Sequence, residues 1–378
     1  MSSPLSQPRW GGVLQVEPTD HCNLACRMCA PHHEGWATVH GVPKGFLDPE
    51  LWAVALDGMV ADDLRFDHVI FQWLGDPSLH PRLHELVGLA ARRLAGRVGY
   101  LRIDTNGVLL DEGRMDALLD AILVPDAPPL LLVLTLDAHS PEAYLRVKGR
   151  DHLLRVRRHV RHLVRRRRAR GARVNLQLQF VVQEGNCDEV RPFFDYWSDL
   201  LRCQGDPARW HDELMFKRLS VGGGGPGQAE ADARYERALR AADLPVAAPG
   251  GPVVGTWERR PWQVDDGHPE AARGACPGLW LTPVIRHDGE LIMCCADLGS
   301  ETALGSLREA SFSALWEGAA ATARRLAHLD GRFEGACAGC GGINWYELRP
   351  GMVEAARDRG RALGLLPGLS GRDDDEHA

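Results

Sequence analysis

The sequence predicts an α/β protein built on a parallel β-sheet, followed by a smaller C-terminal domain. Six apolar runs have the length and composition of strands, and most are separated by segments of helical periodicity; they are residues 13–16, 68–73, 100–103, 130–136, 174–182 and 214–221. This alternation is typical of parallel strands joined by right-handed crossovers. One run, LLLVLTL, is apolar throughout, as expected of a strand buried on both faces. Periodicity leaves open whether the sheet is open or closed into a barrel.

Helices are predicted between these strands at residues 48–62, 82–94 and 112–122, and from residues 153 and 187 onward. The first has clear start signals, because Asp48 can cap its N-terminus and the Pro-Glu pair that follows suits a first helical turn. The fold class predicted from the core is therefore α/β.

The chain changes character at VGGGGPGQ, where four consecutive glycines and a proline exclude regular structure. A Gly/Pro/Ala-rich connector follows, with one short predicted helix near residues 229–242. The final sequence GRDDDEHA is typical of a disordered acidic tail. The predicted parts are a core at residues 13–222, a connector at 223–270, a small domain at 271–346, and a C-terminal helix with the tail at 347–378.

The composition is that of an ordinary globular protein, with 44% hydrophobic and 25% charged residues in a chain of 378. The N-terminus has no signal sequence and no run is long enough to span a bilayer, so we expect a cytoplasmic protein without a membrane partner. The net charge of −7 disfavours a nucleic-acid partner. The basic stretch 155–173 has apolar residues at helical spacing, which favours a solvated helix face over a docking site for an acidic partner.

Three cysteines directly after the first strand give the strongest functional signal. Cys22, Cys26 and Cys29 are separated by three and then two residues in DHCNLACRMCA. Clustered cysteines in a reducing compartment favour metal binding or catalysis over disulfides. Thiolates select iron–sulfur clusters, zinc or copper(I). A closed zinc site needs four ligands, whereas three cysteines leave one iron of a cubane free.

The loop resembles the cluster loop of the radical S-adenosylmethionine (SAM) superfamily. In that family the free iron chelates the amino and carboxylate groups of SAM, and an electron from the [4Fe-4S] cluster cleaves SAM to a 5′-deoxyadenosyl radical. The resemblance covers about residues 13–345 and implies a (β/α)6 partial TIM barrel with its active site at the C-terminal ends of the strands. Met28 stands where the family usually has an aromatic residue, which implies an apolar contact near the adenine.

A turn after the second strand resembles the family's Gly-Glu-Pro element, whose backbone and acidic side chain hold the SAM amino group. The matching residues are Gly75, Asp76 and Pro77, with aspartate in place of the usual glutamate. Further matches after the third and fourth strands imply SAM-pocket roles, with the basic residue reaching the SAM carboxylate; they are Asn106, Thr135, Asp137 and Lys148. Taken singly, each is equally explained by strand-end packing or capping.

The fifth strand carries polar residues at every second position. Asn175, Gln177 and Gln179 therefore face one side of that strand. They point either into the barrel, toward SAM or substrate, or outward to solvent.

Five cysteines near the C-terminus give a second metal-binding signal: Cys276, Cys294, Cys295, Cys337 and Cys340. Their spacing, with the hairpin-like sequence IRHDGELIMCCAD, resembles the SPASM region of the same superfamily, or its shortened twitch form. The full pattern has seven cysteines for two clusters, so the resemblance implies one auxiliary [4Fe-4S] cluster held by Cys276, Cys294, Cys337 and Cys340. Cys295 could replace Cys294, and a four-cysteine zinc site is the structural alternative.

The resemblance implies an oxidoreductase, in which the SAM-derived radical removes a hydrogen atom and the auxiliary cluster accepts the electron of the substrate radical. The implied partners are a small-molecule substrate such as an aminocyclitol or sugar, or a peptide, and an electron donor such as flavodoxin or ferredoxin. The alternatives are an epimerase, a peptide- or protein-modifying maturase, or a metal-binding protein without catalysis. An epimerase needs a thiol hydrogen donor, for which Cys187 is the candidate, although a free cysteine often acts as a small hydrophobe.

Overall fold

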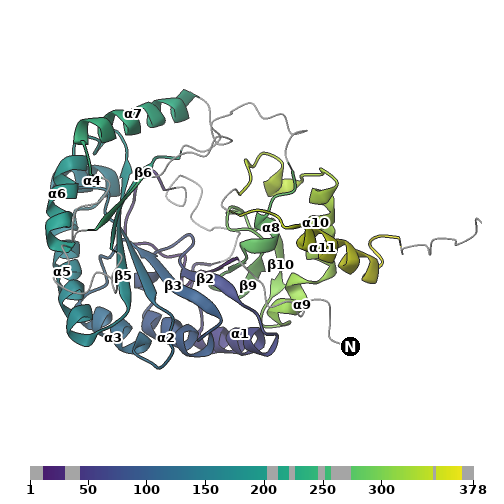
Figure 1. Cartoon of the computed structure of the whole chain (residues 1–378). Helices are drawn as coiled ribbons and strands as arrows, with labels where there is room; N and C mark the ends of the chain where they lie inside the picture. Colours follow the sequence, from purple (N-terminus) through teal and green to yellow (C-terminus); the bar gives the residue numbers. More distant parts are fainter. Residues whose placement is uncertain are drawn as a thin grey trace, which may run out of the picture.

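The computed structural model describes residues 12–29, 43–201, 212–220, 226–245, 252–256, 274–343 and 346–367. Its ten strands form one sheet in the order β10-β9-β8-β1-β2-β3-β4-β5-β6-β7. The strands from β1 to β7 pair in parallel and curve into an open arc, with the helices on its outer face (Figure 1). The predicted α/β fold with a parallel sheet is therefore confirmed.

All six predicted strands form. Their ends differ from the predicted ends by at most three residues. The core strands are β1 Val13–Val16, β2 Phe66–Phe71, β3 Val98–Thr105, β4 Leu130–Thr135, β5 Val174–Val182 and β6 Glu213–Arg218. A seventh strand, β7 Val253–Thr256, lies within the predicted connector and extends the sheet beyond β6. Residues 257–270 of that connector, and the acidic tail from residue 368, lie outside the described residues.

The helices that cover the sheet are α1 Pro49–Ala61, α2 Leu83–Arg93, α3 Glu112–Ile122, α4 Pro141–Lys148, α5 Leu153–Arg170, α6 Val190–Leu201 and α7 Pro226–Ala242. Asp48 caps α1 as predicted, by accepting a hydrogen bond from the Glu50 backbone N–H at 3.0 Å. The sequence analysis missed α4, which is capped by Ser140 and ends at Gly149 with a positive φ of 75°. This short helix proves important for the site.

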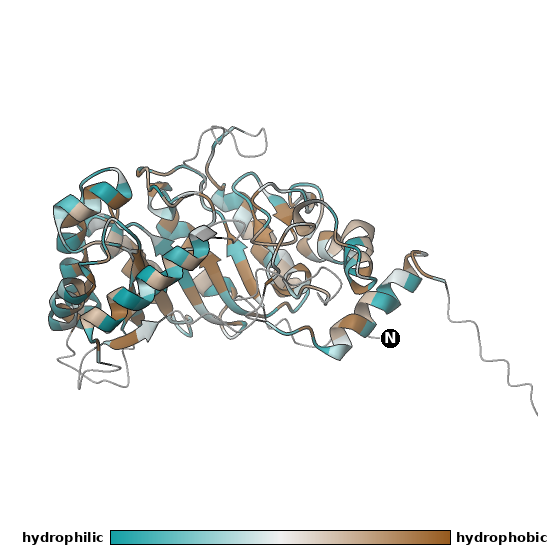
Figure 2. Cartoon of the chain, turned by 90° about the horizontal axis from the view of Figure 1, so that it is seen from above, coloured by the Kyte–Doolittle hydropathy of each residue, from teal (hydrophilic) through white to brown (hydrophobic). Residues whose placement is uncertain are grey.

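The hydrophobic core lies between the sheet and these helices. On β5, Leu176, Leu178 and Phe180 are 0% exposed, and the Phe180 ring meets Phe193 of α6 with 4.9 Å between centroids. The alternating polar residues of β5 therefore lie on the concave face of the sheet. Figure 2 shows the same division, with largely hydrophobic strands inside and helices of mixed character around them.

The basic stretch 155–173 forms most of α5, and its arginines bind neighbouring elements. Arg166 pairs with Asp116 of α3 at 2.9 Å. Arg167 is buried and donates to Asp212, just before β6, at 2.7 Å. The structure thus assigns part of this stretch to internal ion pairs that link α5 to its neighbours.

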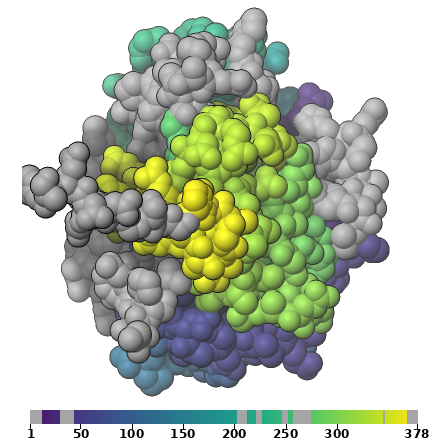
Figure 3. All heavy atoms as spheres, turned by 90° about the vertical axis from the view of Figure 1, so that its right-hand side faces the viewer, coloured from purple at the N-terminus to yellow at the C-terminus, as the bar shows by residue number. Residues whose placement is uncertain are grey.

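The C-terminal part continues the sheet directly, because β8 pairs in parallel with β1 and is followed by antiparallel β9 and β10. It packs beside the N-terminal strands and α1 (Figures 1 and 3). No helix among the described residues is long and apolar enough to cross a membrane. The elements here are α8 Gly278–Leu281, β8 Val284–Ile285, β9 Glu290–Ile292, β10 Ala303–Ser306, α9 Phe312–Trp316, α10 Ala319–Leu329 and α11 Pro350–Ala362.

Candidate active site

The three cysteines of the loop after β1 share one buried environment. The pKa of Cys22 is raised to about 11 and that of Cys29 to about 12, mainly by burial and in smaller part by the negative charge of neighbouring thiolates. Burial also raises the pKa of Cys26, while the positive charge of Lys148 opposes the shift. The thiols therefore lie close enough to one another for their charges to interact. Such a donor set fits a soft, positively charged centre such as an iron–sulfur cluster.

The C-terminal end of α4 holds this loop on both sides of Cys26. The Lys148 carbonyl accepts a hydrogen bond from the Ala25 N–H at 3.2 Å, and the Val147 carbonyl accepts one from the Arg27 N–H at 3.3 Å. Gly149 makes the close approach possible, since a Cβ there would lie 2.8 Å from the Ala25 oxygen. The loop is thereby fixed to a helix end.

The turn after β2 packs against the same loop. The Asp76 N–H donates to the His21 carbonyl at 2.8 Å. A Cβ on Gly75 would lie 2.3 Å from the Thr19 oxygen, so only glycine fits at this position. The structure therefore brings the predicted Gly-Asp-Pro element to the cysteine loop.

The Asp76 carboxylate is 4% exposed and joins the turns after β2 and β3. It accepts hydrogen bonds from the Ser78 N–H at 2.9 Å, the Ser78 hydroxyl at 2.5 Å, the Thr105 hydroxyl at 2.8 Å and the Asn106 N–H at 2.6 Å. The Asn106 side-chain amide in turn donates to Asn23 of the cysteine loop at 2.7 Å. Asp76 and Asn106 thus lie beside the cysteine loop, and the Asp76 carboxylate links the turns after β2 and β3.

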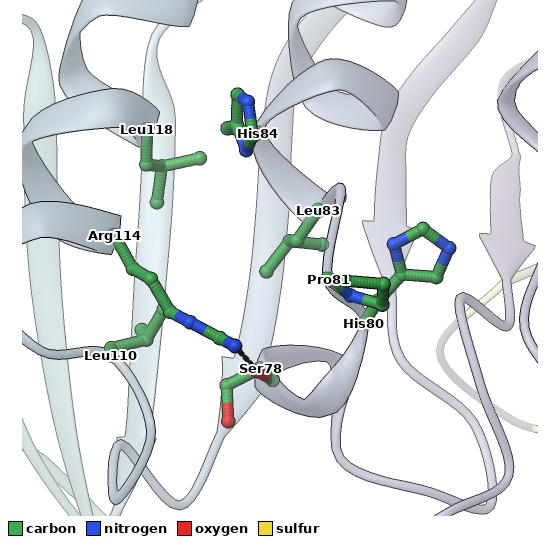
Figure 4. A pocket seen from close by; sticks show the side chains of 8 residues that line it. All are labelled: Ser78, His80, Pro81, Leu83, His84, Leu110, Arg114 and Leu118. Atoms are coloured by element: carbon green, nitrogen blue, oxygen red, sulfur yellow. Dashed lines mark hydrogen bonds between the residues drawn. The ribbon is translucent and has the colours of Figure 1, made fainter.

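A small cavity lies behind this turn, between α2 and α3 (Figure 4). Its volume is about 20 Å³, and Arg114 reaches across it to the Ser78 carbonyl. A cavity of this size holds about one water molecule, so it does not accommodate a substrate.

Thr135, Asp137 and Lys148 come together at the end of β4. Lys148 Nζ lies 2.5 Å from Asp137 Oδ2 and 3.4 Å from the Thr135 hydroxyl, and the Lys148 and Asp137 side chains are 2% and 1% exposed. Burial would lower the pKa of Lys148, but the charges of Asp137 and Cys26 outweigh it and the net shift is upward. The ammonium therefore stays charged beside the cysteine loop. Asp137 has a positive φ of 56° and also accepts the Val181 N–H at 2.7 Å.

Gln177 and Gln179 lie on the concave face of the sheet. This agrees with the first of the two predicted alternatives, in which they point into the barrel rather than to solvent. Gln179 donates to Gln177 at 2.6 Å, and Gln177 donates to Glu213 of β6. Gln183, just beyond β5, contacts the Met28 sulfur at 3.2 Å, which places Met28 against the strand end.

The sequence analysis missed charged residues on the same concave face. Arg102 and Asp104 of β3 form a bidentate ion pair with both contacts at 2.6 Å. Burial and the charge of Arg102 lower the pKa of Lys217 on β6. Because two strands separate β3 from β6, these charges converge across the curve of the sheet. In β3 and β6, polar residues occur at every second position, and this pattern could have revealed the charged residues of the concave face.

The cysteines of the C-terminal part also lie near one another. The charges of Cys294, Cys340 and Cys276, together with burial as the main cause, raise the pKa of Cys337 to about 11. Three of the sulfurs accept hydrogen bonds: Cys276 from the Ile343 N–H at 3.3 Å, Cys340 from the Gly342 N–H at 3.4 Å, and Cys294 from the Thr282 hydroxyl at 3.9 Å. Cys295 shares a hydrogen bond with Cys294 that raises the pKa of Cys294 and lowers its own. Among the described residues, no three His, Cys, Asp or Glu side chains are arranged to hold a single metal ion.

One segment after β2 contacts both groups of cysteines. Trp73 Nε1 donates to the Cys295 carbonyl at 3.0 Å, three residues before Asp76 contacts the first cysteine loop. Between them, the Leu74 N–H donates to Glu17 at 3.3 Å. The two cysteine groups therefore flank a single short stretch of chain.

His287 ties the C-terminal hairpin to the end of β1. Its Nδ1 lies 3.0 Å from Glu17 and 4.0 Å from Asp20. Burial opposes protonation, but the hydrogen bond to Glu17 and the charges of Glu17, Asp20 and Asp288 outweigh it and raise the pKa of His287. Its Nε2 faces the Pro43 carbonyl at 3.3 Å.

This cluster predicts a pH-dependent stability. A raised folded-state pKa means that protonated His287 stabilises the fold fully below the unfolded pKa of about 6.5, and that this stabilisation is lost as pH rises through the folded pKa. We expect chemical denaturation of the apoprotein between about pH 5.5 and 8.5 to show the wild type losing its advantage over His287→Gln as pH rises. An advantage that grows with pH would contradict the ion-pair assignment.

No hydrogen bond among the described residues links Cys187 to the cysteine loop. Its sulfur lies 3.9 Å from the Glu184 carbonyl, within the segment between β5 and α6. Its predicted role as a hydrogen donor stays a prediction.

Comparison with known proteins matches two parts of the chain. Residues 16–173 match the radical SAM superfamily, and residues 276–341 match SPASM, an iron–sulfur cluster-binding domain. A Pyrococcus furiosus protein, described as a tungsten-containing aldehyde ferredoxin oxidoreductase cofactor-modifying protein, is 33% identical over 102 residues. That match spans 26% of this chain and only 25% of the relative.

Two solved structures share the fold. The structure of anSMEcpe with bound AdoMet and Cp18Cys peptide has a TM-score of 0.54 at 15% identity, covering 93% of this chain and 96% of that one. SuiB from Streptococcus suis has a TM-score of 0.52 at 12% identity, covering 81% and 65%.

A partial α/β barrel with a three-cysteine loop at its strand ends offers soft ligands for an iron–sulfur centre. This chain belongs to the radical SAM superfamily and carries a C-terminal SPASM domain. The resemblance inferred from the cysteine spacing is confirmed, and the cofactors of these domains are a [4Fe-4S] cluster with SAM and an auxiliary iron–sulfur centre.

Proposed function

We propose that this enzyme is an oxidoreductase that removes a hydrogen atom from a polar substrate and passes the remaining electron to the auxiliary centre. In this proposal Cys22, Cys26 and Cys29 hold the SAM-binding cluster, and the auxiliary ligands are Cys276, Cys294, Cys337 and Cys340. The observation that carries it is the segment from Trp73 to Asp76, which contacts both cysteine regions. A short covalent and hydrogen-bonded connection favours electron transfer between two centres.

The bound clusters and SAM supply the one-electron and radical chemistry. The residues of this chain bind SAM and the substrate and orient them for the reaction. Asp76 and Asn106, fixed by the turns after β2 and β3, are proposed to face the SAM amino group. The pair of Lys148 and Asp137, with Thr135, is proposed to face its carboxylate and ribose, while Met28 contributes apolar contact near the adenine.

The concave face supports a polar substrate. Arg102, Asp104, Glu213 and Lys217 lie there with Gln177 and Gln179, whereas the apolar strand residues face the helices. A concave face lined by charged and amide side chains favours a molecule with hydroxyl and amino groups over an apolar one. An aminocyclitol or sugar fits this chemistry best, and a peptide segment is the second candidate. An electron donor such as flavodoxin or ferredoxin completes the proposal.

Epimerisation is the second candidate reaction, and Cys187 is the residue that would serve it. A thiol can return a hydrogen atom to a carbon radical, and this thiol lies directly after β5 near the strand ends. Its contact with its own loop gives no direct support for that role.

The test uses anaerobic incubation of the reduced enzyme with SAM and a panel of aminocyclitols, sugars and peptides in deuterated buffer. We expect a product that has lost two hydrogens, with one SAM consumed per product, in the wild type and equally in Cys187→Ala and Cys187→Ser. Serine is the matched control, because it keeps the size of the side chain but has no weak S–H bond. An unoxidised product that gains one deuterium in the wild type, and disappears in both variants, would replace oxidation by epimerisation.

A further inference from the structure

Tyr144 is a buried phenol beside the cysteine loop that the predicted site does not use. It lies on α4 and is 0% exposed. Its apolar neighbours form a small cluster of their own with Ala138, Ala143 and Leu153. Its hydroxyl has no hydrogen-bond partner among the described residues. An unsatisfied buried hydroxyl destabilises a protein, so a native structure that keeps one calls for a partner that binds later.

Tyr144 lies about one helical turn before the end of α4 that holds the neighbours of Cys26. Tyr144 precedes Val147 by three residues and Lys148 by four, so the three side chains lie on one face of the helix. The carbonyls of Val147 and Lys148 hold Arg27 and Ala25, the two neighbours of Cys26. The C-terminal end of α4 therefore packs against the loop at the middle cysteine, about one turn from Tyr144.

The charges around the hydroxyl identify the same neighbour. Burial is the main cause of a raised Tyr144 pKa, and the groups that act on it are Lys148, Cys26, Asp137 and Asp76, in that order. Cys26 is the first cysteine among them, and Lys148 and Asp137 already pair with each other. A thiolate that ligates iron remains negatively charged and accepts hydrogen bonds, whereas the protonated thiol of the apoprotein is a weak acceptor.

We propose that Tyr144 is a positioning residue for the SAM-binding cluster, whose hydroxyl donates a hydrogen bond to the Cys26 sulfur when the cluster is bound. The bond would stabilise the more negative, reduced form of the cluster, because hydrogen bonds to the sulfurs raise the reduction potential. It would also complete the hydrogen bonding of a hydroxyl that the apoprotein leaves unsatisfied.

The test compares Tyr144→Phe with a matched control, Tyr235→Phe. Tyr235 is buried on α7, away from the cysteine loop, and its hydroxyl donates to the Phe216 carbonyl at 3.1 Å. In the apoprotein we expect Tyr144→Phe to keep or raise the melting temperature by about 1–3 °C, and Tyr235→Phe to lower it by a similar amount.

In the reconstituted protein we expect Tyr144→Phe to weaken reduction of the SAM-binding cluster about tenfold, which is about 59 mV toward more negative potential. Tyr235→Phe should leave the potential unchanged. Pulsed electron paramagnetic resonance of the reduced cluster should show an exchangeable hydron in the wild type that is lost in Tyr144→Phe. None of these measurements needs substrate, so they stand apart from the proposed oxidation.

Two results would overturn the proposal. A Tyr144→Phe apoprotein destabilised as much as Tyr235→Phe would mean that the hydroxyl already has a partner without the cluster. An unchanged potential would remove Cys26 as the acceptor, and if SAM affinity fell in the same variant, the partner would be SAM instead.

Discussion

We expect that replacing Cys22, Cys26 and Cys29 together by alanine will abolish reductive cleavage of SAM and remove about four of an expected eight irons per reconstituted chain. The reason is that these three thiols are the proposed ligands of the SAM-binding cluster, and they share one buried environment after β1. Iron analysis and the yield of 5′-deoxyadenosine under anaerobic reduction measure both effects. Cys187→Ala is the matched control, because it removes a thiol outside both cysteine groups and should retain both readouts.

The iron count also tests the auxiliary site. Retention of 5′-deoxyadenosine formation in the triple variant would show that the loop does not carry the SAM-binding cluster. A wild-type protein with four irons and one zinc would instead assign the four C-terminal cysteines to a zinc site, and the proposed electron acceptor would be lost.

Replacing Lys148 by methionine is expected to destabilise the fold by about 3–5 kcal/mol and to weaken SAM binding. The substitution leaves the Asp137 carboxylate buried without its cationic partner, which is the costly way to break a buried ion pair. It also removes the positive charge that lowers the pKa of all three cysteines of the loop. Denaturant titration and equilibrium binding of SAM to the reconstituted protein measure the two effects.

Two further variants separate stability from binding. Arg167→Met breaks another buried ion pair, that with Asp212, and should destabilise the fold comparably without changing SAM affinity. Adding Asp137→Asn to Lys148→Met removes the orphaned charge and should recover much of the stability, since asparagine tolerates the positive φ at this position. Full SAM affinity in Lys148→Met would assign Lys148 to folding alone.

The strands and cysteine loops could be predicted because their signals are local. The strand at Val174–Val182 matches its predicted bounds, since its apolar and polar residues alternate within nine positions. The helix α4 was missed although Ser140 and Pro141 supply start signals, because it is only eight residues long and lies directly before α5. The strand β7 was missed because its four residues lie in a Gly/Pro-rich stretch, where only pairing with β6 makes them a strand.

The sequence by itself determined the chemistry available to this protein: two sets of thiols at defined spacing, one with three members, and a parallel α/β core to carry them. Ligand type and spacing are properties of a few consecutive residues, so they can be recognised without knowledge of the fold. Only the tertiary structure decided which groups meet. Glu17 and His287 are 270 positions apart, and they pair because β8 adds to the edge of β1. Likewise, the end of α4 meets the cysteine loop because the Val147 and Lys148 carbonyls accept hydrogen bonds from Arg27 and Ala25, a contact set by strand order and crossover rather than by any local pattern.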